Sequence, residues 1–452
     1  MNVLITNPQE VQAYTIMRCL RPSARRIIVA EGEHSVGSTG FQGMTVYSRF
    51  VDSKYRAPPF AGDWLAGRLE SWNTDAEEAY VQRIEEICRL ESVDVIFPSL
   101  DPEVYLFAKN KQRFAKQGVV TVVPDPDVIR VPMDKGLTIQ VAQRVGFPCP
   151  KTFFPDSAAD LAHIAAHSEP PWIVKPRFTA HGANMVLVEH ASELEGAYLK
   201  VSGLQHSPMV QEYIKGRHKQ NYYVIVSRDG QILSLLSPRA LRTSEFERYR
   251  ISTKTAVSAS TAPYLAELRS LLRELGLWGG YTVQTKIDPR DGIPKLLEIN
   301  PRLGQHLWWR TGLGVNEPLI CLQIARGETP TGDFRFRDGV MLLDPYFDFF
   351  ALYSQVVAAI FRIVRRLVNR SGDRADSAAQ SESPGIIETL RLYRRDYLNL
   401  RPKIFCPEVS NLLVDPYPCL QAFWFKFHSM TASHVRNISQ ALVRRLRRPR
   451  TA

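Results

Sequence analysis

The first 123 residues alternate between short apolar runs and stretches with helical periodicity. Apolar runs predict strands at Val3–Thr6, Ile27–Ala30, Val93–Pro98 and Val119–Val123. Apolar residues recur at helical spacing in Val11–Leu20, Ala76–Leu90 and Val104–Phe114. Strands that alternate with helices favour a parallel sheet, because parallel strands need a crossover connection. The alternation therefore predicts an α/β fold that opens with a doubly wound sheet.

Composition narrows the class of protein. The chain has 452 residues, of which 44% are hydrophobic and 23% charged. These values exclude wholesale disorder, collagen and a polytopic membrane protein, and the length predicts two to four domains of about 150 residues each. The six scattered cysteines include no C-x-x-C pair, which fits a reducing cytosol. The N-terminus has neither a basic region nor a long apolar core, so we expect a cytoplasmic protein without a signal peptide.

The positive charge is concentrated near the C-terminus. Residues 331–452 hold 19 Lys and Arg against 11 Asp and Glu, a net charge of +8 out of +11 for the chain. The first 330 residues are close to neutral, unlike a uniformly basic nucleic-acid binder. We therefore expect no nucleic-acid partner and an enzyme body that acts on small molecules.

Known nucleotide-binding turns are absent from the sequence. It contains neither the dinucleotide motif G-x-G-x-x-G nor a Walker A motif, which argues against a Rossmann dehydrogenase. The loop Pro98–Glu103 follows one of the predicted strands, at the edge where parallel sheets bind ligands. Its acidic residues fit two interpretations equally, a helix start or a substrate contact.

Two lysines stand where phosphates could bind. Lys135 opens a helical pattern, and a helix N-terminus attracts anions. Lys175 ends the apolar strand Trp172–Lys175, and small residues follow it up to Asn184. A lysine in an apolar strand is costly to bury without an anion, and a small-residue loop offers backbone N–H groups. The alternatives are a surface charge for Lys135 and an edge-strand lysine with an ordinary turn for Lys175.

The segment Val210–Gly216 is predicted to be a strand that leads into a hinge. Such an extended segment presents backbone N–H and C=O groups at the spacing of an adenine edge. A second strand over Asn221–Val226 and the turn Arg228–Gly230 follow. Without the other segments, this pattern is equally that of an ordinary β-hairpin.

The hairpin formed by Tyr281–Ile287 and Lys295–Asn300 carries the strongest pattern. Glu298 and Asn300 are two residues apart on one strand, so they share a face of the sheet, and Gln284 lies on the paired strand. Oxygen-bearing side chains of this kind suit Mg²⁺. Arg302 follows closely and could stabilise a transferred phosphoryl group or an oxyanion. The alternative to a metal site is a half-buried hairpin whose polar face is exposed to solvent.

In order and spacing, these motifs resemble the ATP-grasp superfamily. The resemblance rests on Met133-Asp134-Lys135, Val174-Lys175-Pro176, Gln211–Gly216, Gln284 and Leu297-Glu298-Ile299-Asn300-Pro301-Arg302. It covers roughly residues 1–330, including an N-terminal pre-ATP-grasp domain. The turn Asp288–Gly292 and Gly304 look most like the D-aspartate ligases and the predicted carboxylate–amine ligases.

The resemblance implies a reaction and a set of site residues. Members activate a carboxylate as an acylphosphate with Mg-ATP (or Mn²⁺ in place of Mg²⁺), and an amine then displaces the phosphate. Lys135 and Lys175 would bind phosphates, and Arg302 would face the acylphosphate as a catalytic residue beside Lys175. The remaining implied residues are Gln211, Glu212 and Ile214 for adenine, Asn221 for ribose, and Gln284, Glu298 and Asn300 for the metal.

Three features depart from the usual pattern of the superfamily. Ala180-His181-Gly182 lacks a second glycine of the phosphate loop, Arg217–Lys219 replaces a glutamate after the hinge, and Gln284 replaces an acidic metal ligand. The glutamine at the last position resembles carbamoyl-phosphate synthetase.

Four further side chains are candidates for substrate contacts. They are His181, Arg239, Arg242 and Trp308. The two arginines precede a polar segment, Thr243–Thr255, that we interpret as a substrate loop. His181 in a loop is more often a bystander, and an aromatic residue beside Gly304, such as Trp308, is more often part of the core.

The predicted domains are a pre-ATP-grasp domain over 1–122, an ATP-grasp domain over 123–330 with its lid near 150–205, and a C-terminal extension over 331–452. Within the extension, 369–384 is polar and without periodicity, which indicates a flexible linker. Tyr346–Arg370 and Val435–Arg450 form basic amphipathic patterns. These helices either pack on the catalytic body or lie on an anionic membrane surface.

The leading hypothesis is an ADP-forming carboxylate–amine ligase that acts on small molecules and forms an amide or peptide-like bond. The alternative is a non-catalytic ATP-binding module that recruits a partner or a membrane through the basic extension. A third hypothesis is ligation onto a membrane-linked substrate by a protein held peripherally at the inner membrane surface. A homodimer would fit any of the three.

Overall fold

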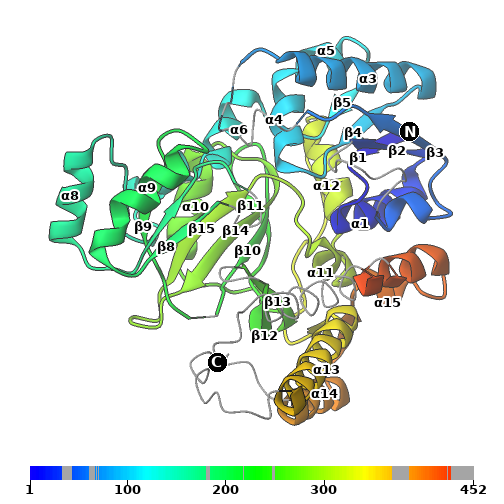
Figure 1. Cartoon of the computed structure of the whole chain (residues 1–452). Coiled ribbons are helices and arrows are strands. Elements are labelled where there is room, and N and C mark those ends of the chain that lie inside the picture. Colours follow the sequence, from blue (N-terminus) through cyan, green and yellow to red (C-terminus); the bar gives the residue numbers. More distant parts are fainter. Residues whose placement is uncertain are drawn as a thin grey trace.

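A computed structural model describes residues 1–32, 43–60, 67, 69, 71–179, 184–216, 218–246, 250–368, 386–424 and 426–428. Within these ranges, side chains are described except at 243–246, 250–254, 358, 361–368 and 408. The described residues form four β-sheets with helices around them (Figure 1).

The first sheet is parallel throughout, in the strand order β3-β2-β1-β4-β5. Its strands are β1 (Asn2–Thr6), β2 (Arg26–Gly32), β3 (Ser53–Ala57), β4 (Val95–Phe97) and β5 (Val120–Thr121). Its helices are α1 (Val11–Leu20), α3 (Asp75–Glu91), α4 (Asp101–Lys109) and α5 (Lys111–Ala115). A capping box between Thr74 and Glu77 starts α3, which satisfies N–H groups that have no partner within the helix. The predicted doubly wound sheet is therefore present.

Two antiparallel sheets follow. One has the order β6-β9-β7-β8 and the other β11-β10-β14-β15. The first consists of β6 (Thr152–Phe153), β7 (Trp172–Lys175), β8 (Val186–Val188) and β9 (Met209–Glu212), with helices α8 (Ala158–His167) and α9 (Leu194–Ser202). The second consists of β10 (Tyr222–Val226), β11 (Ile232–Leu236), β14 (Gly279–Ile287) and β15 (Pro294–Asn300). Helices α6 (Pro126–Met133), α7 (Lys135–Arg144) and α10 (Leu265–Glu274) lie beside them, and Figure 1 shows α8 and α9 at the outer edge.

The hydrophobic core is shared between the first sheet and the β10–β14–β15 sheet. One cluster runs from Leu4 and Ile28 to Tyr281 and Val283, all fully or almost fully buried. The other face of the first sheet packs against α1, α11 (Leu307–Gly312) and α12 (Glu317–Ala325). This continuous packing fixes the carboxyl edge of the parallel strands against the strand β15. The predicted domain boundaries near 122 and 330 remain predictions.

The C-terminal extension contributes strands as well as helices. Strands β12 (Arg239–Phe246) and β13 (Arg250–Val257) form a hairpin, and β13 pairs with β16 (Met341–Leu343), which pairs with β17 (Lys403–Phe405). Helices α13 (Pro345–Val368), α14 (Ile386–Leu398) and α15 (Pro407–Ser410) surround this sheet, and residues 416–424 are also helical. α13 confirms the predicted helix near Tyr346–Arg370, whereas 369–384 and the whole of Val435–Arg450 lie outside the described residues.

Buried polar contacts join the extension to the rest of the chain. Arg242 on β12 donates to Asp348 on α13 at 2.6 and 2.7 Å and to Asp396 on α14 at 2.7 Å. Near the other end of the extension, the buried Asp415 accepts hydrogen bonds from the Tyr14 and Ser48 hydroxyl groups. The extension is therefore tied both to β12 and to the first sheet's helix α1.

Two predicted elements differ from the structure. The predicted helix Val104–Phe114 is two helices, because the Asn110 side chain donates to the carbonyl of Leu106 and ends α4. The polar segment Thr243–Thr255 is largely strand, since β12 and β13 pair along most of their length. The sequence pattern missed this hairpin because the polar residues of Thr243–Thr255 do not alternate regularly with apolar ones.

We expect Arg242→Leu to destabilise the protein strongly. The substitution leaves Asp348 buried without its cation and leaves Asp396 with Arg395 alone, and breaking a buried ion pair costs about 3–5 kcal/mol. Denaturant unfolding followed by circular dichroism measures the loss. The matched control is Arg335→Leu, whose pair with Asp333 is exposed and should leave the transition unchanged. Equal effects of the two variants would contradict the buried network.

Candidate active site

The start of α7 is held against the end of β7. Asp134 caps α7 by accepting from the N–H groups of Gly136 and Leu137, at 2.8 and 3.2 Å. The Arg177 guanidinium donates to both carboxylate oxygens of Asp134, at 2.8 and 2.6 Å. A Cβ atom on Gly136 would lie 2.9 Å from the Arg177 Nε, so glycine permits this close approach. The arrangement brings Lys135, after the cap, close to the strand that ends in Lys175.

Lys135 is nearly buried and faces the β14–β15 hairpin. Its Nζ donates to the carbonyl of Thr179 at 2.7 Å and lies 3.3 Å from Glu298 Oε2. Burial raises the pKa of Glu298, but the positive charges of Lys135, Lys219 and Lys175 outweigh it and hold that pKa below its ordinary value. Glu298 is therefore an ionised carboxylate within reach of several cations.

The positive charges at this carboxylate are not balanced. Lys175 is only 6% exposed, and burial together with the charge of Lys135 lowers its pKa to about 7, although Glu298 opposes the shift. Burial also lowers the pKa of Lys219, again against the attraction of Glu298. Three lysines therefore surround one carboxylate. Buried ammonium groups need anionic partners, so the site is suited to a ligand with several negative charges.

The metal-ligand candidates lie together on the hairpin. Gln284 pairs directly with Glu298 across the two strands, and Asn300 lies opposite Thr282. Directly opposed residues point to the same face, so the three oxygen-bearing side chains of Gln284, Glu298 and Asn300 share it. In the described part of the chain, no group of three or more His, Cys, Asp or Glu side chains could hold a metal ion. One acid with two amides nevertheless offers the oxygen donors that Mg²⁺ prefers.

Close packing fixes the chain that follows this hairpin. A Cβ atom on Gly304 would lie 2.7 Å from Thr282 Oγ1, so the chain passes directly over β14 there. Glycine at this position lets the backbone approach the sheet beside Asn300.

The residues predicted to bind adenine and ribose lie on β9 or between β9 and β10. Gln211 on β9 is buried and donates to Thr152 Oγ1 at 2.8 Å. The Glu212 carboxylate forms an ion pair with Arg290 at 2.5 Å. Ile214 is buried just beyond β9, and Asn221 Oδ1 accepts from the N–H of Thr285 on β14 at 3.4 Å. The segment therefore links the lid sheet to the hairpin, and the roles of these residues toward a nucleotide remain predictions.

Arg302 lies between the first sheet and the hairpin. Its Nε is 3.0 Å from Asp101 Oδ1, at the start of α4, and both side chains are less than one-fifth exposed. Asp101 belongs to the loop Pro98–Glu103, for which the sequence left two interpretations. Glu103 in that loop is fully buried, accepts from the N–H groups of Ser99 and Leu100, and serves as a helix cap. The loop therefore starts a helix and also supplies a partner for Arg302.

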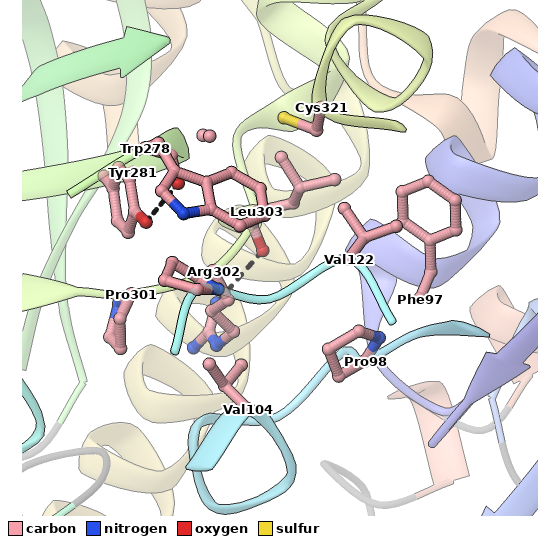
Figure 2. Close-up of a pocket in the computed structure, with 13 residues that line it drawn as sticks. Phe97, Pro98, Val104, Val122, Trp278, Tyr281, Pro301, Arg302, Leu303 and Cys321 are labelled. Carbon is pink, nitrogen blue, oxygen red and sulfur yellow. Dashed lines mark hydrogen bonds between the residues drawn. The ribbon is translucent and has the colours of Figure 1, made fainter. Parts of the chain in front are cut away.

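A small cavity opens beside Arg302. Figure 2 shows the Arg302 guanidinium near Val104, with the apolar side chains of Leu303 and Pro98 around it. The cavity is lined by Phe97, Pro98, Val104, Val122, Pro124, Trp278, Gly279, Gly280, Tyr281, Pro301, Arg302, Leu303 and Cys321. Arg302 is the one charged residue in this lining, and the strand that precedes it carries Glu298 and Asn300.

Three of the four substrate candidates lie in the part of the chain that the structure describes. Arg242 is bound by Asp348 and Asp396, and Arg239 is exposed at the start of β12. Trp308 is buried on α11 and packs against Trp309 in an apolar cluster. His181 lies outside the described residues. Their substrate roles remain predictions.

Two residues of the site escaped the sequence interpretation. In the sequence, Lys219 stands out only because Arg217–Lys219 departs from the superfamily pattern. In the structure, its Nζ lies 3.5 Å from Gln284 Oε1, and its backbone forms a β-bridge with Lys286 on β14. Asp101 was one acid among several in its loop. The signal for Lys219 was its position, three residues before the strand β10, which pairs with the β14–β15 hairpin.

Comparison with known families agrees with this geometry. Residues 133–305 match the family model of the ATP-grasp domain. These residues form an ATP-grasp domain. Residues 72–123 match the PylC-like N-terminal domain, in the part of the chain that contains α3, β4 and α4. The resemblance to the ATP-grasp superfamily and the predicted fold class are therefore confirmed.

Curated relatives are similar to the ATP-grasp region and its surroundings. The chain is 22% identical over 240 residues to the carbamoyl phosphate synthase large chain of Halomonas eurihalina, covering 50% of this chain and 22% of the relative. The corresponding large chain of Thermus thermophilus is 22% identical over 251 residues, covering 51% and 24%. The chain thus spans less than a quarter of the length of these relatives.

Solved structures share the ATP-grasp fold over most of the chain. The biotin carboxylase domain of Hydrogenobacter thermophilus 2-oxoglutarate carboxylase has a TM-score of 0.57 at 17% identity, covering 74% of this chain and 72% of that one. The L-amino acid ligase of Bacillus licheniformis has a TM-score of 0.52 at 16% identity, covering 72% and 74%. N5-carboxyaminoimidazole synthetase of Staphylococcus aureus has a TM-score of 0.52 at 12% identity, covering 75% and 79%.

We expect Lys175→Met to stabilise the ligand-free protein most at low pH. An unfolded lysine keeps its proton up to about pH 10, whereas the pKa of Lys175 in the folded protein is about 7. The native state therefore binds fewer protons between these values, and its stability rises with pH in that window. The substitution removes this dependence, so its gain in melting temperature should be largest at or below pH 7 and should shrink toward pH 10.

The matched control for that experiment is Lys116→Met. Lys116 is exposed after α5, so its substitution should change the melting temperature equally at all these pH values. A pH-independent effect of Lys175→Met would show that Lys175 is not an uncompensated buried ammonium group.

Proposed function

We propose that this protein is an ATP-dependent carboxylate–amine ligase. In the proposed reaction, a carboxylate oxygen attacks the γ-phosphorus of ATP, which yields an acylphosphate and ADP. An amine then attacks the acyl carbon, and phosphate leaves as the amide bond forms. The observation that carries this proposal is the cluster of three lysines at Glu298, next to the ATP-grasp hairpin.

The charge of the cluster supports a polyphosphate ligand. When all are protonated, Lys135, Lys175 and Lys219 supply three positive charges against the one negative charge of Glu298. Bound phosphates would complete the neutralisation, and they would raise the pKa of Lys175 back toward the ordinary value of a lysine. The lysines would also orient the γ-phosphate, since phosphoryl transfer depends mainly on positioning and electrostatic stabilisation.

The face with Gln284, Glu298 and Asn300 fits a magnesium ion. Bound there, Mg²⁺ would neutralise phosphate charge and bridge the phosphates to the hairpin. The chain's own contribution is to hold these three oxygen donors on adjacent strands, in register with each other. Lys135, 3.3 Å from Glu298, keeps the carboxylate ionised and ready to ligate.

We propose that the Arg302 guanidinium binds the substrate carboxylate. Arg302 follows the metal-ligand strand by two residues, and Asp101 holds its guanidinium beside the cavity. A substrate carboxylate bound at Arg302 would lie close to Asn300. The apolar lining of the cavity would then face the rest of the substrate.

Properties of similar proteins agree with this chemistry. The Hydrogenobacter thermophilus domain was solved with MgADP and bicarbonate, and the Bacillus licheniformis protein is a ligase of L-amino acids. At the identities found, these similarities establish the shared fold. ATP, Mg²⁺ and amide-bond formation are therefore proposals for this chain, which rest on its lysine cluster and its oxygen donors.

We expect the purified protein to release ADP and phosphate from Mg-ATP only when an acid and an amine are both present. Pools of amino acids, small carboxylates and amines serve as the screen, with coupled detection of ADP. Glu298→Gln and Lys175→Ala should each abolish the release, and Glu274→Gln is the matched control on the exposed helix α10. Full activity in both site variants would contradict the assignment. ATP binding without turnover in any pool would favour the non-catalytic alternative.

We expect Arg302→Met to separate catalysis from nucleotide binding. Loss of a charge that stabilises the transition state lowers kcat by roughly 100-fold or more. Because Arg302 faces Asp101 and not the lysine cluster, the Kd for Mg-ADP should stay within about twofold of wild type. Isothermal calorimetry measures the Kd and steady-state kinetics measure kcat. A parallel loss of nucleotide binding would place Arg302 at the phosphates instead.

A further inference from the structure

Exposed apolar side chains are concentrated in the C-terminal extension. Of the 19 large apolar side chains that are exposed in the described part of the chain, 15 lie between Phe349 and Trp424. The catalytic body and the first sheet together expose the other four, at separate places. Scattered exposed apolar residues are ordinary, but a concentration of them marks an interaction surface.

Helix α14 has its polar face turned inward. Thr389 and Asp396 are buried, and the hydroxyl of Tyr393 donates to the carbonyl of Asp348 at 3.0 Å. The opposite face carries Ile387 and Leu398, which are 69% and 70% exposed. A helix that only packed on the body would bury its apolar side chains. The outward face of α14 therefore carries apolar side chains that no described part of the chain covers.

Basic residues share this outward face of α14. Arg391 and Arg394 are exposed and lie at helical spacing between Ile387 and Leu398. The spacing of 4, 3 and 4 residues keeps all of them on one face. Leucine and isoleucine interleaved with arginine match an amphipathic helix at an anionic bilayer surface.

A second exposed apolar group adjoins α13. The ring of Phe423 lies 5.0 Å from that of Phe349 on α13, and both side chains are more than one-third exposed. Leu413 and Leu420 are 96% and 59% exposed, and Trp424 is 58% exposed. α13 also packs against α14, and Figure 1 shows these helices at the end of the molecule away from α8 and α9.

We propose that the outward face of α14, together with the exposed apolar side chains of α13 and residues 407–424, docks on an anionic phospholipid bilayer. The charge of the extension is complementary to such a surface, since residues 331–452 carry +8. Aromatic side chains such as Tyr417 and Trp424 suit the boundary between headgroups and acyl chains. In the described residues, no helix is both long and apolar enough to cross a bilayer. The extension would therefore lie on the surface.

A second copy of the chain fits this face less well. In a two-fold interface, the same patch meets itself. Arg391 and Arg394 would then approach their own counterparts, and Glu388 is the exposed acid described on that helix. Repulsion between the arginines opposes self-association, whereas phosphate headgroups would neutralise them.

Vesicle co-sedimentation of the full chain tests the proposal. The probes are vesicles of phosphatidylcholine alone, and of phosphatidylcholine and phosphatidylglycerol in equal parts. We expect binding to the mixed vesicles that weakens with added salt, because exposed charges are screened. The double variant Leu390→Asp with Leu413→Asp should lower the bound fraction at least roughly tenfold.

Two control variants sharpen this test. Leu199→Asp with Leu204→Asp makes the same change at exposed positions of the lid, and it should bind vesicles like wild type. Arg391→Gln with Arg394→Gln should remove most of the preference for the anionic vesicles. Binding should also shift the tryptophan emission to shorter wavelength, and Trp424→Phe should reduce this shift.

Three results would overturn the proposal. The first is no binding to either vesicle. The second is an equal loss of binding in the lid control. The third is a dimer in light scattering that Leu390→Asp with Leu413→Asp converts to a monomer, without vesicle binding by either form; this result would assign the face to a second copy. None of these measurements depends on ligase activity.

Discussion

The site depends on one electrostatic condition, the placement of three lysines at a single carboxylate. Lys135, Lys175 and Lys219 come from segments that are far apart in the sequence, and Glu298 meets them from a fourth. Bringing like charges together in a buried place opposes folding. The shared core behind the hairpin and the link between Asp134 and Arg177 supply the packing and the hydrogen bonds that hold the arrangement. A polyanionic ligand would offset the repulsion between these lysines.

Much of this arrangement could be predicted from local patterns. Alternating apolar runs located β1, β2, β7, β10, β14 and β15, because buried strands leave a direct periodic signal. The two-residue spacing of Glu298 and Asn300 placed both on one face, which the register with Gln284 and Thr282 confirms. Lys175 was recognisable as a charge at the end of an apolar strand. Each of these inferences used residues within one element or one hairpin.

Contacts between distant segments could not be predicted in the same way. The sequence made Arg242 a candidate for substrate contacts, but it gave no sign that Asp348 and Asp396, 106 and 154 residues away, bind it. Asp101 and Arg302 are 201 residues apart. The strands β16 and β17 have three residues each, which is too short for a periodic pattern, and only their pairing with β13 makes them strands. The apolar outward face of α14 likewise became visible only when the helix was oriented by Asp396 and Tyr393.

The hydrogen bond between Tyr14 and Asp415 links residues that are 401 positions apart. Helix α1 therefore gains Asp415 as a buried partner only after the 401 residues that follow Tyr14 have been synthesised. Synthesis proceeds from the N-terminus, and domains usually fold in that order. In this protein, the Tyr14 hydroxyl on α1 would lack its partner until Asp415 has been synthesised. A chain that stopped before Asp415 would leave the Tyr14 hydroxyl without this buried partner.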